Sequence, residues 1–234
     1  PLLTRELESL GATALAERNG GVDFQADLPK LYRVLLGTRL ASRLLLPLKR
    51  VEALSSDALY EAALTLPWPE IFPADARFAI DVAGHSPAIT HTHFAALRLK
   101  DAVVDVFRER TGGRPDIDTD APDIRLHLHL RRDAAQISLD ISNGSLHRRG
   151  YRTQSREAPL KETLAAALLM RAGWPKHAAA GEAFIDPFCG SGTLVIEAAM
   201  MATSTAPGLL RGRFASPRWR AHEPELWAEV LEDV

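Results

Sequence analysis

The residues best suited to carry chemistry lie in one short segment, 186–193, with the sequence DPFCGSGT. The apolar run 183–185 before it predicts a brief buried strand, and the apolar residues 194–201 after it predict a helix that is buried on several sides. A carboxylate and glycines between a strand and a helix are typical of the edge where open α/β sheets bind ligands. Gly190 and Gly192 can adopt positive φ, and the first N–H groups of the helix can donate hydrogen bonds. The pattern predicts a site for a nucleotide-like molecule.

Several cofactors can bind at a turn of this kind, and the residues at particular positions of the segment distinguish between them. An ATP-binding P-loop requires a lysine directly after its last glycine, but Thr193 follows Gly192. A dinucleotide fingerprint requires a third glycine at the position of Val195. Asp186, four residues before Gly190, suits a cationic ligand better than a pyrophosphate. S-adenosylmethionine, which carries a sulfonium and an ammonium group, is therefore favoured, and a glycine-rich turn of another small-molecule α/β enzyme remains the alternative.

A basic cluster forms the second candidate site, at the junction of two predicted domains. Arginines can hold phosphates and an aromatic ring can stack on a base, so the cluster predicts RNA binding. A solvated linker, or an interdomain staple that pairs with Asp or Glu, is the alternative. A second basic stretch, 211–220, is either another RNA contact or a loop packed against other residues. The residues of the first cluster are His147, Arg148, Arg149, Tyr151, Arg152 and Arg156.

Metal binding is not expected. His127 and His129 share one face of a predicted strand, and His91 and His93 lie close together in the sequence. No cysteine is near them and no Asp or Glu has ligand spacing on that strand, so exposed histidines on the wet side of a hairpin are favoured. Cys189, the single cysteine, is expected to pack beneath the glycine-rich loop as a small hydrophobe.

Composition and charge exclude several classes of protein. With 234 residues, 46% apolar and 25% charged, the chain is neither disordered nor fibrous. It contains no run of about eighteen apolar residues and no signal-peptide pattern, so a cytoplasmic protein with no membrane partner is expected. The net charge is −2, but residues 1–50 and 121–160 each carry +3, while 51–120 carry −6. Positive charge is thus concentrated in two segments.

The first half of the chain has the periodicities of an α+β protein. Within 1–50 we expect a helix that reaches Ala14, a strand at 22–24, a second helix, and a strand at 44–48. Because a small sandwich of this kind normally begins with a strand, a first strand is expected to be missing. The elements expected next are a helix capped by Ser55 through Leu64, a strand at 78–82, a helix at 93–110, and a hairpin with strands at 124–130 and 137–141.

A new domain is predicted to begin near residue 158. An Ala/Leu helix precedes Gly173, Trp174 and Pro175, which are expected to stop it. On the apolar helix 194–201, Glu197 either reaches back to the loop or acts as a capping carboxylate, and an amphipathic stretch follows at 224–230. Only 77 residues follow Glu157, whereas domains usually need about 100 to 150, so an incomplete domain is expected.

Two blocks, 158–165 (APLKETLA) and 186–199 (DPFCGSGTLVIEAA), resemble the THUMP-domain RNA methyltransferases, specifically the bacterial RlmL-type 23S rRNA (guanine-N2)-methyltransferases. The resemblance extends through most of the chain, including 146–152, 120–125 and 40–43. It implies an N-terminal ferredoxin-like domain at 1–50 and a THUMP RNA-binding domain at 51–150, whose start lies between 30 and 55. It further implies a linker and the start of a Rossmann-like class I methyltransferase domain at 151–234.

The resemblance also implies a function and a set of contacts. The function is S-adenosylmethionine-dependent methylation of the guanine N2 in 23S rRNA or a ribosomal assembly intermediate. The family holds the target amine with an Asn/Asp-Pro-Pro-aromatic segment, which this chain lacks, so the catalytic residues are expected beyond Val234 and the chain alone is expected to be inactive. A stand-alone RNA-binding adaptor without catalysis is the alternative. The residues implied to hold the cofactor are Asp186, Phe188, Gly190, Ser191, Gly192, Thr193, Lys161, Glu162 and Thr163.

Overall fold

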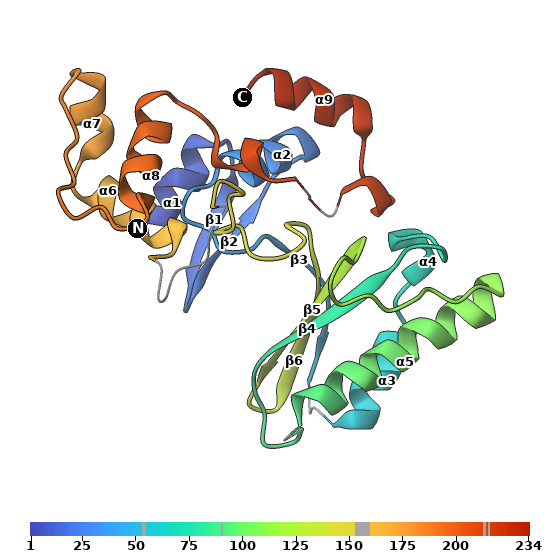
Figure 1. The fold of residues 1–234 in the computed structure, drawn as a ribbon. Helices are drawn as coiled ribbons and strands as arrows, with labels where there is room; N and C mark the ends of the chain where they lie inside the picture. Colours follow the sequence, from blue (N-terminus) through green and yellow to red (C-terminus); the bar gives the residue numbers. More distant parts are fainter. Residues whose placement is uncertain (53–54, 90, 153–159, 213, 215) are drawn as a thin grey trace. The chain divides into compact units, whose positions relative to one another are not determined.

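The computed structural model describes residues 1–52, 55–89, 91–152, 160–212, 214 and 216–234. It divides into two compact units, which we describe one at a time (Figure 1). The first unit consists of Pro1–Ser42, Ser145–Gly212 and Glu223–Val234. The second unit consists of Arg43–Gly144 and Arg213–His222. The mixed α/β class expected from the sequence is confirmed.

The second unit is a four-stranded sheet with two main helices against one face (Figure 1). The strand order is β3, β6, β5, β4, with β4 and β5 parallel and the other two pairings antiparallel. Its elements are β3 (Leu45–Val51), α3 (Ser56–Leu64), α4 (Trp68–Ile71), β4 (Phe78–His85), α5 (Thr92–Thr111), β5 (Ile124–Arg131), β6 (Ala134–Asp140) and the short 3-10 helix η2 (Ser216–Arg218).

Apolar residues at every second position build the core of this unit. Leu126 pairs with Leu139 and Leu128 pairs with Ile137, and all four side chains are fully buried. Phe107 of α5 lies in the same core and packs against Phe72. The centroids of the two rings are 5.1 Å apart. The expected hairpin and the long helix are therefore confirmed. So is the cap of α3, where the Ser55 hydroxyl accepts the N–H of Ala58 at 3.0 Å.

Polar side chains on the opposite face are paired with one another. Arg43 lies 2.8 Å from Asp81, which also accepts a hydrogen bond from Arg125 at 2.8 Å. His127 lies on this face beside these charges and is buried, so the expectation of an exposed ring is wrong for this residue, whereas His129 is exposed. The two rings stack with centroids 6.3 Å apart, and the ion pairs beside them explain how a polar face can be closed to solvent.

The first unit begins with α1 (Leu2–Ser9), a two-stranded antiparallel hairpin of β1 (Thr13–Arg18) and β2 (Gly21–Gln25), and α2 (Leu28–Gly37). The first helix is shorter than expected, because Gly11 adopts φ +92° and turns the chain into β1. Ala14, expected in the helix, therefore lies in a strand. The strand expected at 44–48 pairs with β6 and belongs to the sheet of the second unit.

The rest of the first unit is helical in its described part. It comprises α6 (Glu162–Arg171), α7 (Trp174–Ala179), α8 (Thr193–Ala202), the 3-10 helix η1 (Pro207–Leu210) and α9 (Pro224–Glu232). Gly173, with φ +80°, ends α6 as expected, but Trp174 then begins a further helix that the sequence analysis missed. The indole of Trp174 donates to the carbonyl of Ala198 at 2.9 Å and so joins α7 to α8. The amphipathic stretch at 224–230 forms the helix α9, and its Trp227 packs edge-on against Tyr32 of α2.

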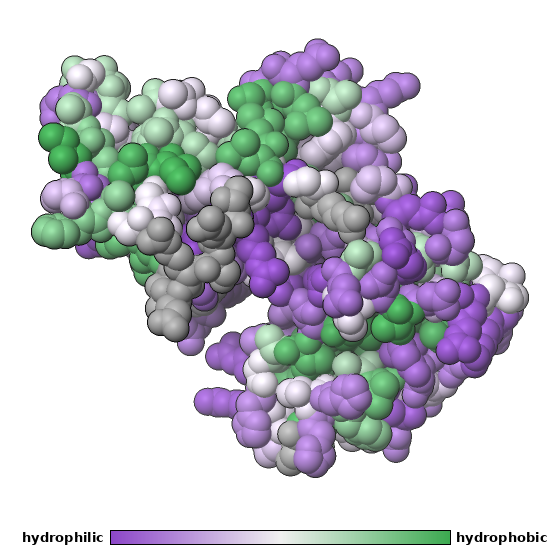
Figure 2. Space-filling model, in the orientation of Figure 1, coloured by the Kyte–Doolittle hydropathy of each residue, from purple (hydrophilic) through white to green (hydrophobic). Residues whose placement is uncertain are grey.

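The strand expected at 183–185 does not form, and Ile185 is 82% exposed. A strand requires a neighbouring strand for its backbone N–H and C=O groups, and none of the strands in the described residues pairs with this run. The helix after it also differs from expectation, because Val195 and Ala199 of α8 are exposed. Figure 2 shows hydrophobic side chains at the surface over α6 to α8.

The aromatic core of the second unit makes a matched test. Replacing the fully buried Phe72 with Ala is expected to destabilise the unit by about 3 to 5 kcal/mol, because the side chains around the cavity relax only in part. Phe94, at the exposed start of α5, is the control, and its replacement with Ala is expected to cost less than about 0.5 kcal/mol. Amide hydrogen exchange of β5 and β6 measures both changes. Equal effects of the two substitutions would contradict this assignment of the core.

The buried His127 predicts acid sensitivity. Burial, assisted by Arg43, lowers the pKa of His127 below its ordinary 6.5, and its Nδ1 has no hydrogen-bond partner among the described residues. The unfolded chain therefore binds more protons than the folded unit as the pH falls through that value, and the unit loses stability. His127→Gln is expected to weaken this pH dependence and His129→Gln to preserve it, as measured by denaturant unfolding at about pH 5 and pH 8.

Candidate cofactor loop and its scaffold

The glycine-rich loop leads directly into α8. Gly192 precedes the helix with φ +77°, donates its N–H to the carbonyl of Cys189 at 2.8 Å, and accepts the N–H of Ile196 at 2.8 Å. Gly190 has φ +56°, and a Cβ at this position would have open space around it. Both glycines therefore occupy the left-handed region, where a side chain is unfavourable. Gly190 also leaves its backbone accessible to a ligand.

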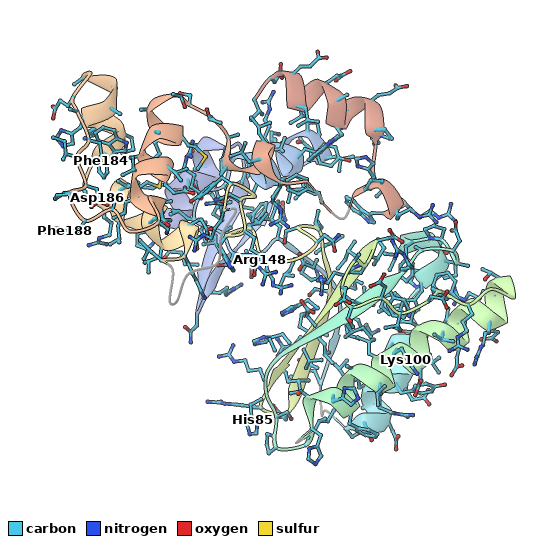
Figure 3. The ribbon with its side chains drawn as sticks, in the orientation of Figure 1. His85, Lys100, Arg148, Phe184, Asp186 and Phe188 are labelled. Carbon is cyan, nitrogen blue, oxygen red and sulfur yellow. The ribbon has the colours of Figure 1, made fainter. Side chains whose placement is uncertain are left out.

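Asp186 lies at the start of this loop, on the segment between α7 and α8 (Figure 3). Its Oδ1 accepts the N–H of Phe188 at 3.1 Å, and no described residue donates to its Oδ2. The Phe188 ring is 94% exposed. Cys189 is exposed as well, so the expectation that it packs beneath the loop is wrong; the turn carries its side chain outward.

The donor and acceptor groups of the loop fit S-adenosylmethionine. Asp186 offers a free carboxylate oxygen to a cationic or hydroxyl group, and the first turn of α8 has no side-chain cap on its N–H groups. The hydroxyls of Ser191 and Thr193 lie 3.2 Å apart at the same helix end. A negatively charged carboxylate, hydrogen-bonding groups and the exposed ring of Phe188 are thus available together around an open backbone.

The three residues expected at the methionine end lie at the start of α6. Lys161 is exposed at the position before the helix, whereas Glu162 and Thr163 are buried. Glu162 lies 3.3 Å from the guanidinium of Arg152, which also donates to the Thr193 hydroxyl at 3.1 Å. Arg152 therefore brings the start of α6 together with the first residue of α8.

The basic cluster does not form one exposed surface. Arg149 is only 2% exposed, and its guanidinium donates to the carbonyls of Leu146 and Arg39 at 3.0 and 2.6 Å. Its predicted contact with phosphate is therefore corrected to a structural role, because the side chain is used inside the unit. Arg148, which is labelled in Figure 3, is exposed, and His147 is partly exposed. Arg156 lies outside the described residues.

A buried carboxylate on α8 collects the inward-facing members of this cluster. Glu197 is fully buried, its Oε1 accepts the Tyr151 hydroxyl at 3.2 Å, and Arg149 lies 3.5 Å away. Burial raises the pKa of Glu197, while Arg149 and Tyr151 oppose the rise. Burial and the nearby carboxylates raise the pKa of Tyr151, so its hydroxyl keeps the proton that it donates. For Arg149 and Tyr151 the structure therefore favours internal pairing with a carboxylate over a surface that binds RNA.

Arg39 and Glu6 also belong to this network, although the sequence did not predict their roles. Arg39 donates to the carbonyls of Met200 and Thr205 at 3.3 and 2.8 Å, at the end of α8. The buried Glu6 accepts the Thr38 hydroxyl and the Arg39 N–H, both at 2.7 Å, and burial raises its pKa. The sequence carries no local signal for these contacts, because Arg39 and its acceptors lie more than 160 positions apart.

The second basic stretch is also partly used in internal contacts. Arg211 donates to the carbonyl of Ser145 in the first unit, and Arg218 pairs with Asp75 in the second. This supports the packed-loop interpretation for these two side chains; residue 213 is outside the described part. Within the described ranges, no group of three or more His, Cys, Asp or Glu could hold a metal ion. None of the helices in those ranges has the length and apolar character to span a membrane.

Family models match three successive parts of the chain. The RlmL ferredoxin-like domain matches residues 1–45, the THUMP domain matches 54–140, and the RMKL-like methyltransferase domain matches 149–231. The four-stranded unit and the glycine-rich loop thus lie in a THUMP-containing methyltransferase architecture. The chain has the succession of domains of the RlmKL type.

The curated relatives agree with this assignment over the whole chain. It is 51% identical to the ribosomal RNA large subunit methyltransferase K/L of Syntrophotalea carbinolica and 48% identical to that of Methylococcus capsulatus. Both alignments cover 100% of this chain but only 33% and 32% of the relatives. The chain therefore spans about a third of the length of these proteins.

Solved structures show the same fold. A predicted N6-adenine-specific DNA methylase from Listeria monocytogenes has a TM-score of 0.83 and 31% identity, with 99% of this chain and 60% of that chain covered. The methyltransferase SMU.472, solved in complex with SAH, has a TM-score of 0.83 and 28% identity with the same coverage.

Substitutions of the neighbouring Arg148 and Arg149 distinguish a structural role from an RNA contact. Arg149→Ala leaves Glu197 as an uncompensated buried charge and is expected to destabilise the protein by about 3 to 5 kcal/mol. Arg148→Ala removes an exposed side chain and is expected to change stability by less than about 0.5 kcal/mol. Denaturant unfolding measures both. A stable Arg149→Ala variant that binds RNA more weakly would restore the interpretation from sequence.

Proposed function

We propose that the full-length protein transfers a methyl group from S-adenosylmethionine to the N2 of a guanine in 23S rRNA. One observation carries the proposal: Asp186 and two left-handed glycines lead into an uncapped helix in a chain homologous, over all of its length, to ribosomal RNA methyltransferases. The SAH complex of the related SMU.472 supports the choice of cofactor.

The residues of this chain would bind the cofactor and orient it. Asp186 accepts a cationic or hydroxyl group of the cofactor, Gly190 admits it close to the backbone, and the first turn of α8 donates N–H groups. When bound, the cofactor supplies a methyl group on a sulfonium. Transfer would form a bond from the guanine N2 to the methyl carbon and break the bond from that carbon to sulfur, releasing S-adenosylhomocysteine and one proton to water. The contribution of the residues in this chain would be to position the two reactants.

RNA recognition is assigned to the THUMP domain and to the exposed Arg148, with a partly exposed His147 beside it. A guanidinium at the surface can bind a phosphate without reading the base. The partner proposed is 23S rRNA or a ribosomal assembly intermediate, and the compartment proposed is the cytoplasm.

Titration of the full-length protein with S-adenosylhomocysteine (SAH) by calorimetry tests the cofactor assignment. Asp186→Asn is expected to weaken binding at least about tenfold, because loss of a charged hydrogen bond costs about 1.5 to 3 kcal/mol. Glu232→Gln, an exposed acidic residue on α9, is the control and is expected to have no effect. Mass spectrometry of methylated 23S rRNA identifies the product. A protein that binds RNA but not SAH would be the adaptor instead.

A further inference from the structure

We propose that Arg152 is a positioning residue for the cofactor loop, which it holds by linking the start of α6 to the first turn of α8. The inference rests on the proposed function in one respect: the ligand of the loop is S-adenosylmethionine. It assigns to Arg152 a role other than the RNA contact expected from sequence.

One nitrogen of Arg152 makes two hydrogen bonds and one ion pair. Its Nη2 lies 3.0 Å from the carbonyl of Leu160, 3.1 Å from the hydroxyl of Thr193, and 3.3 Å from Oε1 of Glu162. The Arg152 side chain is 21% exposed and that of Glu162 only 6%. The Nη2 end of the guanidinium is thus held among three oxygen atoms in a largely buried place.

Thr193 is the point where the loop becomes a helix. Gly192 directly before it and Gly190 both have positive φ, and glycines by themselves impose little on the backbone. The conformation of the loop must therefore be fixed by contacts of the residues next to the glycines. Arg152 supplies such a contact from outside the loop, because it donates to the hydroxyl of Thr193, the residue directly after Gly192.

A second attachment one helical turn later limits the motion of α8. Tyr151, adjacent to Arg152, donates to Glu197, which lies four residues after Thr193 on the same helix face. Tyr151 and Arg152, which are consecutive in the sequence, thus contact α8 at two positions one turn apart, Glu197 and Thr193. The Glu197 attachment is fully buried and serves stability, whereas the Thr193 attachment is at the edge of the loop and affects the ligand.

Charge supports the same conclusion. Without Arg152, Glu162 would be a buried carboxylate without its cation, close to residues that bind the cofactor. Arg152 therefore does two things for the site: it orients Thr193 and it neutralises Glu162.

The decisive experiment measures SAH affinity and the KM for S-adenosylmethionine in the full-length protein. Arg152→Gln is expected to weaken SAH at least about tenfold and to raise KM more than it lowers kcat, with RNA affinity unchanged. Arg152→Lys keeps the charge but not the planar fork, so it is expected to recover only part of the affinity. Adding Glu162→Gln to Arg152→Gln restores neutrality and is expected to recover the electrostatic part. Arg171→Gln, at the exposed end of α6, is the matched control and is expected to bind SAH like wild type.

Two results would overturn the proposal. One is SAH affinity within about twofold of wild type for Arg152→Gln, and the other is a loss of RNA affinity with SAH affinity intact. If the wild-type protein does not bind SAH, the proposed function fails, and amide hydrogen exchange then decides the positioning role separately. Faster exchange at 190–196 in Arg152→Gln, with β5 and β6 unchanged, supports it, and unchanged exchange at 190–196 refutes it. Arg152→Lys provides the same comparison if the Gln variant does not fold.

Discussion

The buried ion pair between Glu197 and Arg149 constrains everything around the cofactor loop. Both side chains are almost completely removed from water, and the desolvation of each ion costs several kcal/mol. Further groups share the charges: the Tyr151 hydroxyl donates to Oε1 of the carboxylate, and the carbonyls of Leu146 and Arg39 accept from the guanidinium. Oε2 of Glu197 has no hydrogen-bond partner among the described residues. The path of the chain from Leu146 to Arg152 is therefore tied to the position of α8.

This constraint makes the scaffold of the loop a product of three separated stretches of the first unit. Arg39 holds the end of α8, Glu6 holds the backbone at Arg39, and Arg152 holds the beginning of α8. Close packing completes the arrangement, since a Cβ on Gly208 would lie 2.7 Å from the backbone of Leu36. The ferredoxin-like part therefore does more than precede the methyltransferase part in sequence; its polar groups help to fix the helix that carries the loop.

Prediction from the sequence succeeded where the relevant information is local. Alternating apolar residues located the β5 and β6 hairpin, Ser55 located the start of α3, and the glycines of the loop adopt the positive φ that their spacing suggested. It failed at 183–185, because an apolar run becomes a strand only when a partner strand is present. It also failed at His127, because ion pairs on the outer sheet face bury a residue that alternation alone places toward water.

The basic cluster shows most clearly which features the sequence determines and which ones the tertiary structure determines. Residue types and spacing alone determined that arginines gather at the junction of two predicted domains, and that a loop suited to a cationic nucleotide-like ligand follows at 186–193. Only the tertiary structure decided that Arg149 and Arg152 point inward, to partners 48 and 41 residues away, while Arg148 stays exposed. The physical reason is that backbone conformation and periodicity depend on near neighbours. The partner of a charge depends on which distant carboxylate the fold buries beside it.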